Sequence, residues 1–332
     1  MNLKQGTPQW FEARKRRLTS SNYGTLLGLN PYSGPREVAA IFHGQSTFTG
    51  NQACRYGSHH EDIAIKAYEK LCGVDVEETG LWVNKDMSEK TNFIDPHREE
   101  PLRKTFLESG MGGSPDGIIK VDGETRGIIE VKCPHSVLLP RFLDKTRYYI
   151  PQVQLNMFFT DTTRCDFINW TPVGLKVWSV ARADTLVVTP RELIEKKAVS
   201  GADHVAHLKK LGLYDGKRVV GYKRIMVSIL FSFFKRLHDP CPQWDRWEFE
   251  QREWVDLIVK VNDITVERAV PLGSTRKDFD MKEVPKKINW TCLLGWQLAA
   301  DKRVGGARFE KFCVVEIKFY MINYYTKNCY SS

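Results

Sequence analysis

The sequence predicts a mixed α/β (α+β) fold in which helices flank a central β-sheet. Two strand-like runs, GIIKV and GIIEVK, are joined by Asp122-Gly123, a dipeptide typical of two-residue hairpin turns. Two further runs, CDFINW and LKVWSV, are joined by a turn from Pro172 to Gly174. Helical patterns precede, separate and follow these pairs, an order that places helices against a sheet. With 332 residues, 42% of them hydrophobic, the chain is long enough to bury such a core.

The expected helices each have a start or stop signal. Thr19 to Ser21 offer N-caps to a short helix, and Pro35 begins the next one. Residues 52–72 form a longer helix, because apolar residues recur there at helical spacing up to a terminating glycine. Pro151 opens the helix PQVQLNMFF, since a first-turn N–H needs no intrahelical partner. A helix over about 190–211 follows, and VDVEETGLWV is expected to be a strand.

The composition indicates a protein of a reducing, intracellular compartment. It also indicates that the chain has two parts. Eight cysteines form no CxxC pair, which argues against a zinc site or a disulfide framework. The polar start MNLKQGTPQ predicts no secretory signal, and both the cytoplasm and the nucleus stay open. The longest apolar run, 225–234, is about half of a membrane span, so no membrane partner is expected.

The charge is unevenly distributed along the chain. Most of the net charge of +9 and five of the nine tryptophans follow residue 215. We therefore predict a boundary near 212–218, with a first domain over 1–215 and a basic, Trp-rich extension of unknown role over 216–332. A basic excess suits a polyanionic partner such as nucleic acid, although a solvated basic surface explains the charge equally well.

Three polar residues around the first hairpin have the composition of a metal site. Side chains alternate along a strand, so Glu130 and Lys132 project to the same side, while the residues between and beside them point into the core. A buried carboxylate and ammonium are costly unless they are paired or functional. Asp116 heads the preceding strand and comes close to Glu130. Such an oxygen-rich site suits Mg²⁺ or Mn²⁺ rather than zinc.

The E-x-K triplet alone is weak evidence, because the chain contains it twice. Glu316 and Lys318 repeat the pattern in VVEIKF, with Asp301 upstream. The first copy differs in its surroundings: an SPDG turn precedes it, and Gln152 and Asn156 follow on one helical face at i, i+4 spacing. Upstream, YGSHHE places Glu61 on a helix whose inner face is otherwise apolar.

These blocks, in this order, resemble the phage lambda exonuclease or YqaJ-type viral recombinase family of the PD-(D/E)xK nuclease superfamily. The herpesvirus alkaline nucleases are the nearest relatives to consider. The resemblance runs from about Trp10 to about 200 and implies a restriction-endonuclease-like core with an extra C-terminal segment. Two departures are the charged connection 84–112 and the basic segment 216–332. The matching blocks are W-x-x-x-R…T-S-S, Y-G-x-x-x-E, S-P-D-G, E-V-K-C-P and Q-V-Q, beginning at Trp10, Tyr56, Ser114, Glu130 and Gln152.

The resemblance implies roles that agree with the reading of the hairpin. Asp116 and Glu130, together with the Val131 backbone carbonyl, are expected to hold Mg²⁺, for which Mn²⁺ can substitute. Glu61 adds a carboxylate, and Lys132 acts on the attacking water.

Two further sets of residues are implied in the same way. Either Gln152 or Gln154 braces the metal site. Arg14, Ser21 and Thr19 recognise the 5′-phosphate of a DNA end, a pairing that suits guanidinium and hydroxyl groups at a helix N-terminus.

The function expected from the resemblance is Mg²⁺-dependent exonuclease activity on double-stranded DNA, 5′-to-3′ from ends, in viral-type recombination or repair. A single-strand annealing protein is the implied partner, and a trimeric homo-oligomer the implied assembly. One alternative is an endonuclease of the same fold. The other is a non-catalytic DNA-binding protein that acts through its basic C-terminal segment.

Overall fold

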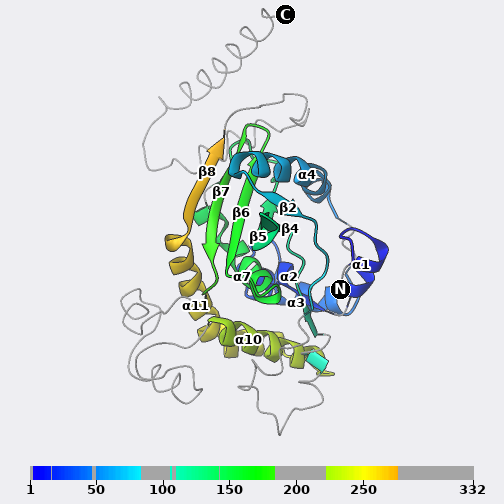
Figure 1. Ribbon diagram of the computed structural model, residues 1–332. Coiled ribbons are helices and arrows are strands. Elements are labelled where there is room, and N and C mark those ends of the chain that lie inside the picture. Colours follow the sequence, from blue (N-terminus) through cyan, green and yellow to red (C-terminus); the bar gives the residue numbers. More distant parts are fainter. Residues whose placement is uncertain are drawn as a thin grey trace, which may run out of the picture. The chain divides into compact units, whose positions relative to one another are not determined.

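The computed structural model describes residues 3–15, 17–46, 50–83, 105–106, 110–141, 143–183 and 222–275 (Figure 1). The chain divides into two compact units, Met1–Phe279 and Asp280–Ser332. The second unit lies outside the described residues, as do the expected helix over 190–211, the expected boundary near 212–218 and the second E-x-K copy at Glu316.

A six-stranded mixed sheet forms the centre of the first unit (Figure 1). Its strand order is β2-β4-β5-β6-β7-β8, and β5 and β6 pair in parallel while the other neighbours are antiparallel. A separate parallel pair joins β1 to β3. The strands are β1 (Leu18–Thr19), β2 (Asp75–Glu77), β3 (Met111–Gly112), β4 (Gly117–Val121), β5 (Glu124–Lys132), β6 (Arg164–Thr171), β7 (Gly174–Ala181) and β8 (Val270–Thr275).

The two hairpins expected from the sequence are confirmed. Asp122 and Gly123 join β4 to β5 with φ angles of 52° and 79°. Positive φ at both central positions is the geometry of a type I′ turn, which matches the twist of the flanking strands and favours Asp-Gly. The resulting register pairs Gly117 with Ile129, so the residue before β4 comes beside the end of β5. The second hairpin joins β6 to β7 with Thr171 paired to Gly174.

The helices begin and end where the sequence signals stand. The helix over 52–72 starts after Asn51, whose side chain accepts a hydrogen bond from the Cys54 N–H, and ends at Gly73 in the left-handed conformation. Proline occupies the first turn of α3 and α7. The helices are α1 (Pro8–Arg14), α2 (Ser20–Leu26), α3 (Pro35–Phe42), α4 (Gln52–Cys72), the 3₁₀ segment η2 (Leu143–Tyr149), α7 (Ile150–Phe159), α10 (Tyr222–Leu237) and α11 (Trp244–Arg268).

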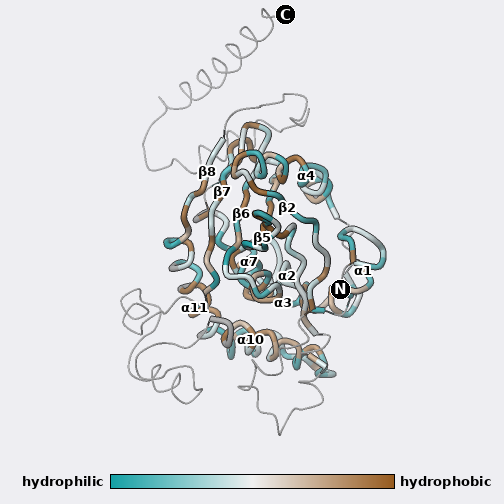
Figure 2. Tube along the Cα trace, in the orientation of Figure 1, coloured by the Kyte–Doolittle hydropathy of each residue, from teal (hydrophilic) through white to brown (hydrophobic). Residues whose placement is uncertain are grey.

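Helices cover both faces of the sheet, and alternate residues of β5 point to opposite sides. Ile129 and Val131 face α4, where they pack in one cluster with Ala64 and Tyr68. Ile128 faces α7 in a second cluster. The brown, apolar residues of the central strands stand out in Figure 2. Fully burying one such aliphatic or aromatic side chain stabilises the fold by about 1.5–3 kcal/mol.

Residues 222–275 are built into this unit. The apolar run 225–234 forms most of α10, whose inner face packs in one cluster with residues of α2, α3 and α7. The Tyr23 hydroxyl donates to the Met226 carbonyl, 203 residues away in sequence. β8 extends the sheet beside β7. The start of the basic segment 216–332 thus shares the core of residues 1–183. In the part of the chain that is described, no helix has both the length and the apolar character needed to cross a membrane.

Candidate active site

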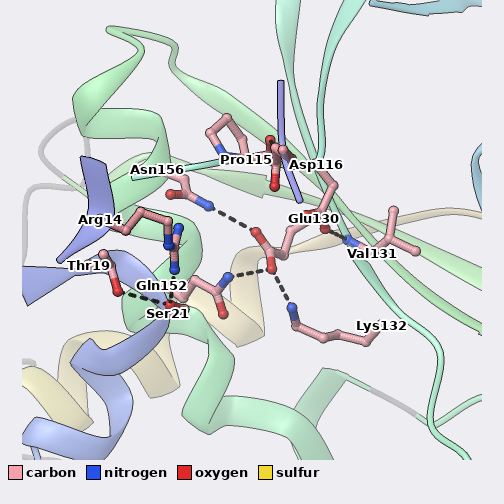
Figure 3. Close-up of polar contacts among 11 residues, drawn as sticks. Arg14, Thr19, Ser21, Pro115, Asp116, Glu130, Val131, Lys132, Gln152 and Asn156 are labelled. Atoms are coloured by element: carbon pink, nitrogen blue, oxygen red, sulfur yellow. Dashed lines mark hydrogen bonds and ion pairs between the residues drawn. The ribbon is translucent and has the colours of Figure 1, made fainter. Parts of the chain in front are cut away.

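Glu130, fully buried near the end of β5, is the centre of a polar cluster (Figure 3). The Gln152 amide donates to Glu130 Oε1 at 2.5 Å, and the Asn156 amide donates to Oε2 at 2.9 Å. Lys132 forms an ion pair with Oε1. The contact of Lys132 with Glu130 confirms that the two side chains share one side of the strand.

The crossover from β5 to β6 explains why α7 supplies these donors. Parallel strands require a crossover connection, and α7 is the helix within it. Gln152 and Asn156 are one helical turn apart, so both amides reach the same carboxylate. Gln154 points elsewhere: its amide donates to the Ala181 carbonyl at 3.0 Å and its oxygen accepts from the Ala183 N–H at 2.7 Å. The contact with Glu130 thus belongs to Gln152.

The hairpin register holds Asp116 beside Glu130. The Val131 N–H donates to Asp116 Oδ2 at 2.7 Å, and the Asp116 N–H donates to the Ile129 carbonyl at 3.2 Å. Val131 therefore contacts Asp116 through its amide. The role predicted for its carbonyl, that of a metal ligand, stays a prediction.

The acidic groups of the cluster repel one another. Burial raises the pKa of Glu130 to about 7, with added repulsion from Asp116. Burial and repulsion by Asp116 raise the pKa of Glu61, on α4, to about 8. Burial also raises the pKa of Asp116, against the opposing attraction of Lys132. Burial by itself lowers the pKa of Lys132, but attraction by Glu130 and Asp116 outweighs it and raises that pKa overall. Three mutually repelling carboxyls share this site.

The donor set fits a hard divalent cation. Carboxylates that crowd together in a buried place are stabilised by a bound cation, and oxygen ligands suit Mg²⁺ or Mn²⁺. Within the described residues, no three His, Cys, Asp or Glu side chains already stand in a ligand arrangement. N–H donors occupy both Glu130 oxygens and one Asp116 oxygen.

A second polar group, formed by Arg14, Thr19 and Ser21, lies next to the carboxylates (Figure 3), and its contact with Ser114 joins α1 and α2 to the SPDG turn. The Arg14 guanidinium donates to Ser114 Oγ at 3.1 Å and to Ser21 Oγ at 3.0 Å. The hydroxyls of Thr19 and Ser21 are 3.0 Å apart. Burial lowers the pKa of Arg14 to about 10, against the attraction of Glu130 and Asp116. The three residues expected at a DNA end thus lie together.

Several residues of the site were not assigned a role from the sequence. Trp10 lies with its ring 4.2 Å from the Arg14 guanidinium, and its indole N–H donates to Ser114 Oγ at 3.1 Å. Asn156 is fully buried and Tyr149 packs under Lys132. In the sequence, the feature that pointed to Asn156 was its i, i+4 spacing from Gln152. Trp10 and Ser114 stand in the recognised motif blocks, but only the fold places them around one guanidinium.

The sheet and its acidic hairpin define the class of this domain, a mixed α/β fold with the PD-(D/E)xK pattern at Pro115-Asp116 and Glu130-Val131-Lys132. Residues 9–163 match the family model of the YqaJ-like viral recombinase domain. This segment, a little under half of the chain, is similar to that family.

One viral protein and two solved structures are also similar to this chain. The uncharacterized protein R354 of Acanthamoeba polyphaga mimivirus is 24% identical over 179 residues, which are 50% of this chain and only 29% of that protein. Two crystal structures of the alkaline exonuclease LHK-Exo are similar to this chain: the enzyme from Laribacter hongkongensis with a TM-score of 0.40, and its complex with dAMP with 0.38. Both are 18% identical and cover 76% of this chain and 100% of the solved one.

Proposed function

We propose that this protein is a divalent-metal-dependent DNA exonuclease, which hydrolyses phosphodiester bonds of duplex DNA from 5′ ends. The observation that carries the proposal is the Asp116–Glu130–Lys132 cluster, buried in one hairpin of a YqaJ-like viral recombinase domain. Acids held close together beside a lysine are suited to bind a metal and to stabilise charge on a phosphate.

Each residue of the cluster has a distinct task in this mechanism. Asp116 and Glu130, with Glu61, would hold Mg²⁺ or Mn²⁺, which would polarise the phosphate and lower the pKa of the attacking water. The Lys132 ammonium, a hydrogen-bond donor fixed by Glu130 and the Tyr149 ring, orients the attacking water or stabilises the developing negative charge. Gln152 and Asn156 keep the Glu130 carboxylate in place.

The Arg14 group supports the choice of 5′ ends. Arg14 is a cation even with its lowered pKa, and it already holds two hydroxyls at about 3 Å. A guanidinium and the hydroxyls of Ser21 and Thr19 form charge-assisted hydrogen bonds with a terminal phosphate. Recognition of that phosphate at one side of the metal site would set the 5′-to-3′ direction.

The biological setting is a proposal drawn from the family. A role in viral-type recombination, a single-strand annealing partner and a trimeric assembly are consistent with the recombinase domain. The chain spans less than a third of the mimivirus protein that it matches, so activities of that whole protein do not transfer to it.

Digestion of end-labelled linear duplex with and without Mg²⁺ tests the proposal. Release of label from the 5′ end before internal fragments appear is the expected result, and covalently closed circles of the same sequence should stay intact. Cleavage of closed circles at a similar rate would instead establish an endonuclease. DNA binding without any cleavage, under either Mg²⁺ or Mn²⁺, would establish the non-catalytic alternative.

Arg14→Ala tests the end-recognition role. Loss of one charge-assisted contact costs about 1.5–3 kcal/mol, so degradation of 5′-phosphorylated duplex should fall by roughly 10- to 150-fold. Duplex with 5′-hydroxyl ends should lose much less. The matched control is Arg126→Ala, which removes an arginine paired with Glu124 on the surface. Equal losses on the two kinds of end would refute the role.

A further inference from the structure

Gln5, shortly before α1, contacts the SPDG turn directly in front of Asp116. Its amide nitrogen donates to the Pro115 carbonyl at 2.7 Å and to the Thr79 carbonyl at 3.1 Å. Because both partners are acceptors, the nitrogen of the amide faces them, and it uses both of its protons. Pro115 is buried, where a carbonyl without a partner would be costly. The Gln5 amide thus joins the SPDG turn to a segment 110 positions away in sequence.

A tight turn directs Gln5 to this place. The Thr7 N–H donates to the Lys4 carbonyl at 3.4 Å, and Gly6 has a φ of 75°. A positive φ at the third position of a four-residue turn is typical of a type II turn, which favours glycine there. The Thr7 hydroxyl also caps α1 by accepting from the Trp10 N–H at 3.3 Å. Gln5 therefore occupies the second position of a defined turn that leads into α1.

The chain before this turn packs closely against the loop after β2. A Cβ atom at Gly80 would lie only 2.1 Å from the Leu3 carbonyl oxygen, so glycine is needed for this approach. Lys4 and Glu78 form an ion pair at 3.2 Å, but their side chains are 69% and 62% exposed, so the pair contributes little. Backbone packing holds the segment here, and Gln5 connects it to the catalytic hairpin.

The peptide unit between Pro115 and Asp116 is held from both sides. Its carbonyl accepts from Gln5, and its N–H donates to the Ile129 carbonyl of β5 at 3.2 Å. A peptide unit is planar, so hydrogen bonds at its two opposite edges fix its rotation. That rotation sets the direction in which the Asp116 side chain leaves the backbone. The position of the carboxylate, whose Oδ2 accepts from the Val131 N–H at 2.7 Å, depends on this direction.

We propose that Gln5 is a positioning residue for the metal site. By holding the Pro115 carbonyl, it fixes the Asp116 carboxylate in the orientation that a bound Mg²⁺ or Mn²⁺ requires. This inference rests on the proposed function, since that function makes Asp116 a metal ligand. β5 holds the peptide unit before Asp116 at one edge, and Gln5 holds the other. One short segment thus serves both parts of the site, the DNA end through Arg14 and the metal through Gln5.

Binding of Mn²⁺ to the protein without DNA, measured by calorimetry, tests this role apart from catalysis. Gln5→Ala should weaken Mn²⁺ binding by about 2- to 13-fold, the range for the loss of one hydrogen bond. Gln5→Met keeps the length of the side chain but has no N–H donor, and it should weaken binding to the same extent. Lys4→Ala, the matched control in the same turn, should bind Mn²⁺ like the wild type.

Steady-state kinetics should distinguish positioning from a contact that only stabilises the fold. In Gln5→Ala, kcat at limiting Mg²⁺ should fall and should recover when the Mg²⁺ concentration is raised. KM for 5′-phosphorylated duplex should be unchanged, because the DNA end is held through Arg14. A contact with a structural role alone would lower Tm and leave the Mg²⁺ concentration at half-maximal rate as in the wild type.

The outcomes separate this role from the proposed function. Equal Mn²⁺ affinity in wild type, Gln5→Ala and Gln5→Met would overturn the role of Gln5, even if the protein degrades DNA normally. An equal loss in Lys4→Ala would also overturn it, because the whole segment and not the Gln5 amide would then matter. Weaker Mn²⁺ binding in the two Gln5 variants alone would support the role, even if the wild type cleaves no DNA. A wild type that binds no Mn²⁺ would refute the metal site and the role of Gln5 together.

Discussion

Two buried carboxylates on neighbouring strands, Glu130 on β5 and Asp166 on β6, have opposite surroundings. Each is fully buried, and each has a cation two residues away in sequence. Asp166 accepts two hydrogen bonds from Arg164, both at 2.8 Å, and one from the Tyr68 hydroxyl at 2.5 Å. Glu130 is held by one lysine and two neutral amides, and it is repelled by Asp116.

The comparison shows that burial of an acid does not by itself indicate a functional site. A two-pronged arginine contact and a phenol satisfy Asp166, so this cluster ties α4 to the sheet. Glu130 shares its place with two more acids, Asp116 and Glu61, and the pKa of each of the three is raised. Crowding of acids, rather than depth of burial, distinguishes the proposed cation site from Asp166.

The largest expected effect is the loss of catalysis. Asp116→Ala or Glu130→Ala should abolish divalent-dependent degradation of duplex DNA, because the metal loses an oxygen ligand, while DNA binding survives. Gel-based digestion and a binding assay on the same preparations measure both. Glu316→Ala, in the second E-x-K copy, is the control and should degrade DNA at the wild-type rate. An equal loss in that variant would mean that the catalytic copy is the other one.

Asp166→Ala should affect stability and leave chemistry intact. Removing one partner of a fully buried ion pair costs about 3–5 kcal/mol. Arg164 is 43% exposed and can turn to water, so we expect about 2–3 kcal/mol here, measured by urea unfolding. Residual activity per folded molecule should match the wild type. A folded Asp166→Ala protein without activity would remove the distinction between the two carboxylates.

The two glutamines of α7 offer a smaller test of the same contrast. Gln152→Ala removes a donor to Glu130, and kcat/KM should fall by about tenfold, since a hydrogen bond to a charged group is worth about 1.5 kcal/mol or more. Gln154→Ala leaves the Ala181 carbonyl and Ala183 N–H without their partner, so the free energy of unfolding should drop by about 1–3 kcal/mol with little change in kcat/KM. The reverse pattern would show that Gln154 braces the site.

The smallest effect is a pH dependence of stability in the metal-free protein. The folded pKa values of Glu61 and Glu130, about 8 and 7, exceed the ordinary value of 4.5. The two protonated carboxyls therefore make their full contribution to the free energy of unfolding below pH 4.5, and this contribution is lost as the pH rises through 7 and 8. Tm should therefore fall by a few degrees between pH 6 and pH 9, and Mg²⁺ should restore it most at pH 9. The double variant Glu61→Gln, Glu130→Gln should flatten this profile. A larger Mg²⁺ effect at pH 6 would contradict the assignment.

Local signals predicted much of the fold and part of the site. The Asp122-Gly123 turn, the glycine end of the 52–72 helix and the alternation around Glu130 depend on nearby residues only, and the structure confirms them. The choice between Gln152 and Gln154 could not be made from the sequence, because it depends on the rotation of α7 against the sheet. Contacts such as Tyr68 with Asp166 join residues 98 positions apart and carry no local pattern.

The hairpin has a consequence for how the site is assembled from the chain. The contact that holds Asp116 beside Glu130 closes a segment of only 15 residues, whereas Arg14 meets Ser114 across 100. Closing the longer segment costs roughly 1.7 kcal/mol more in chain entropy by the logarithmic length rule. Asp116 and Glu130 are therefore brought together by local chain geometry, whereas Arg14 meets the SPDG turn only once distant segments have docked. Partial opening of the N-terminal helices would loosen the proposed contact with a DNA end while Asp116 and Glu130 keep their spacing.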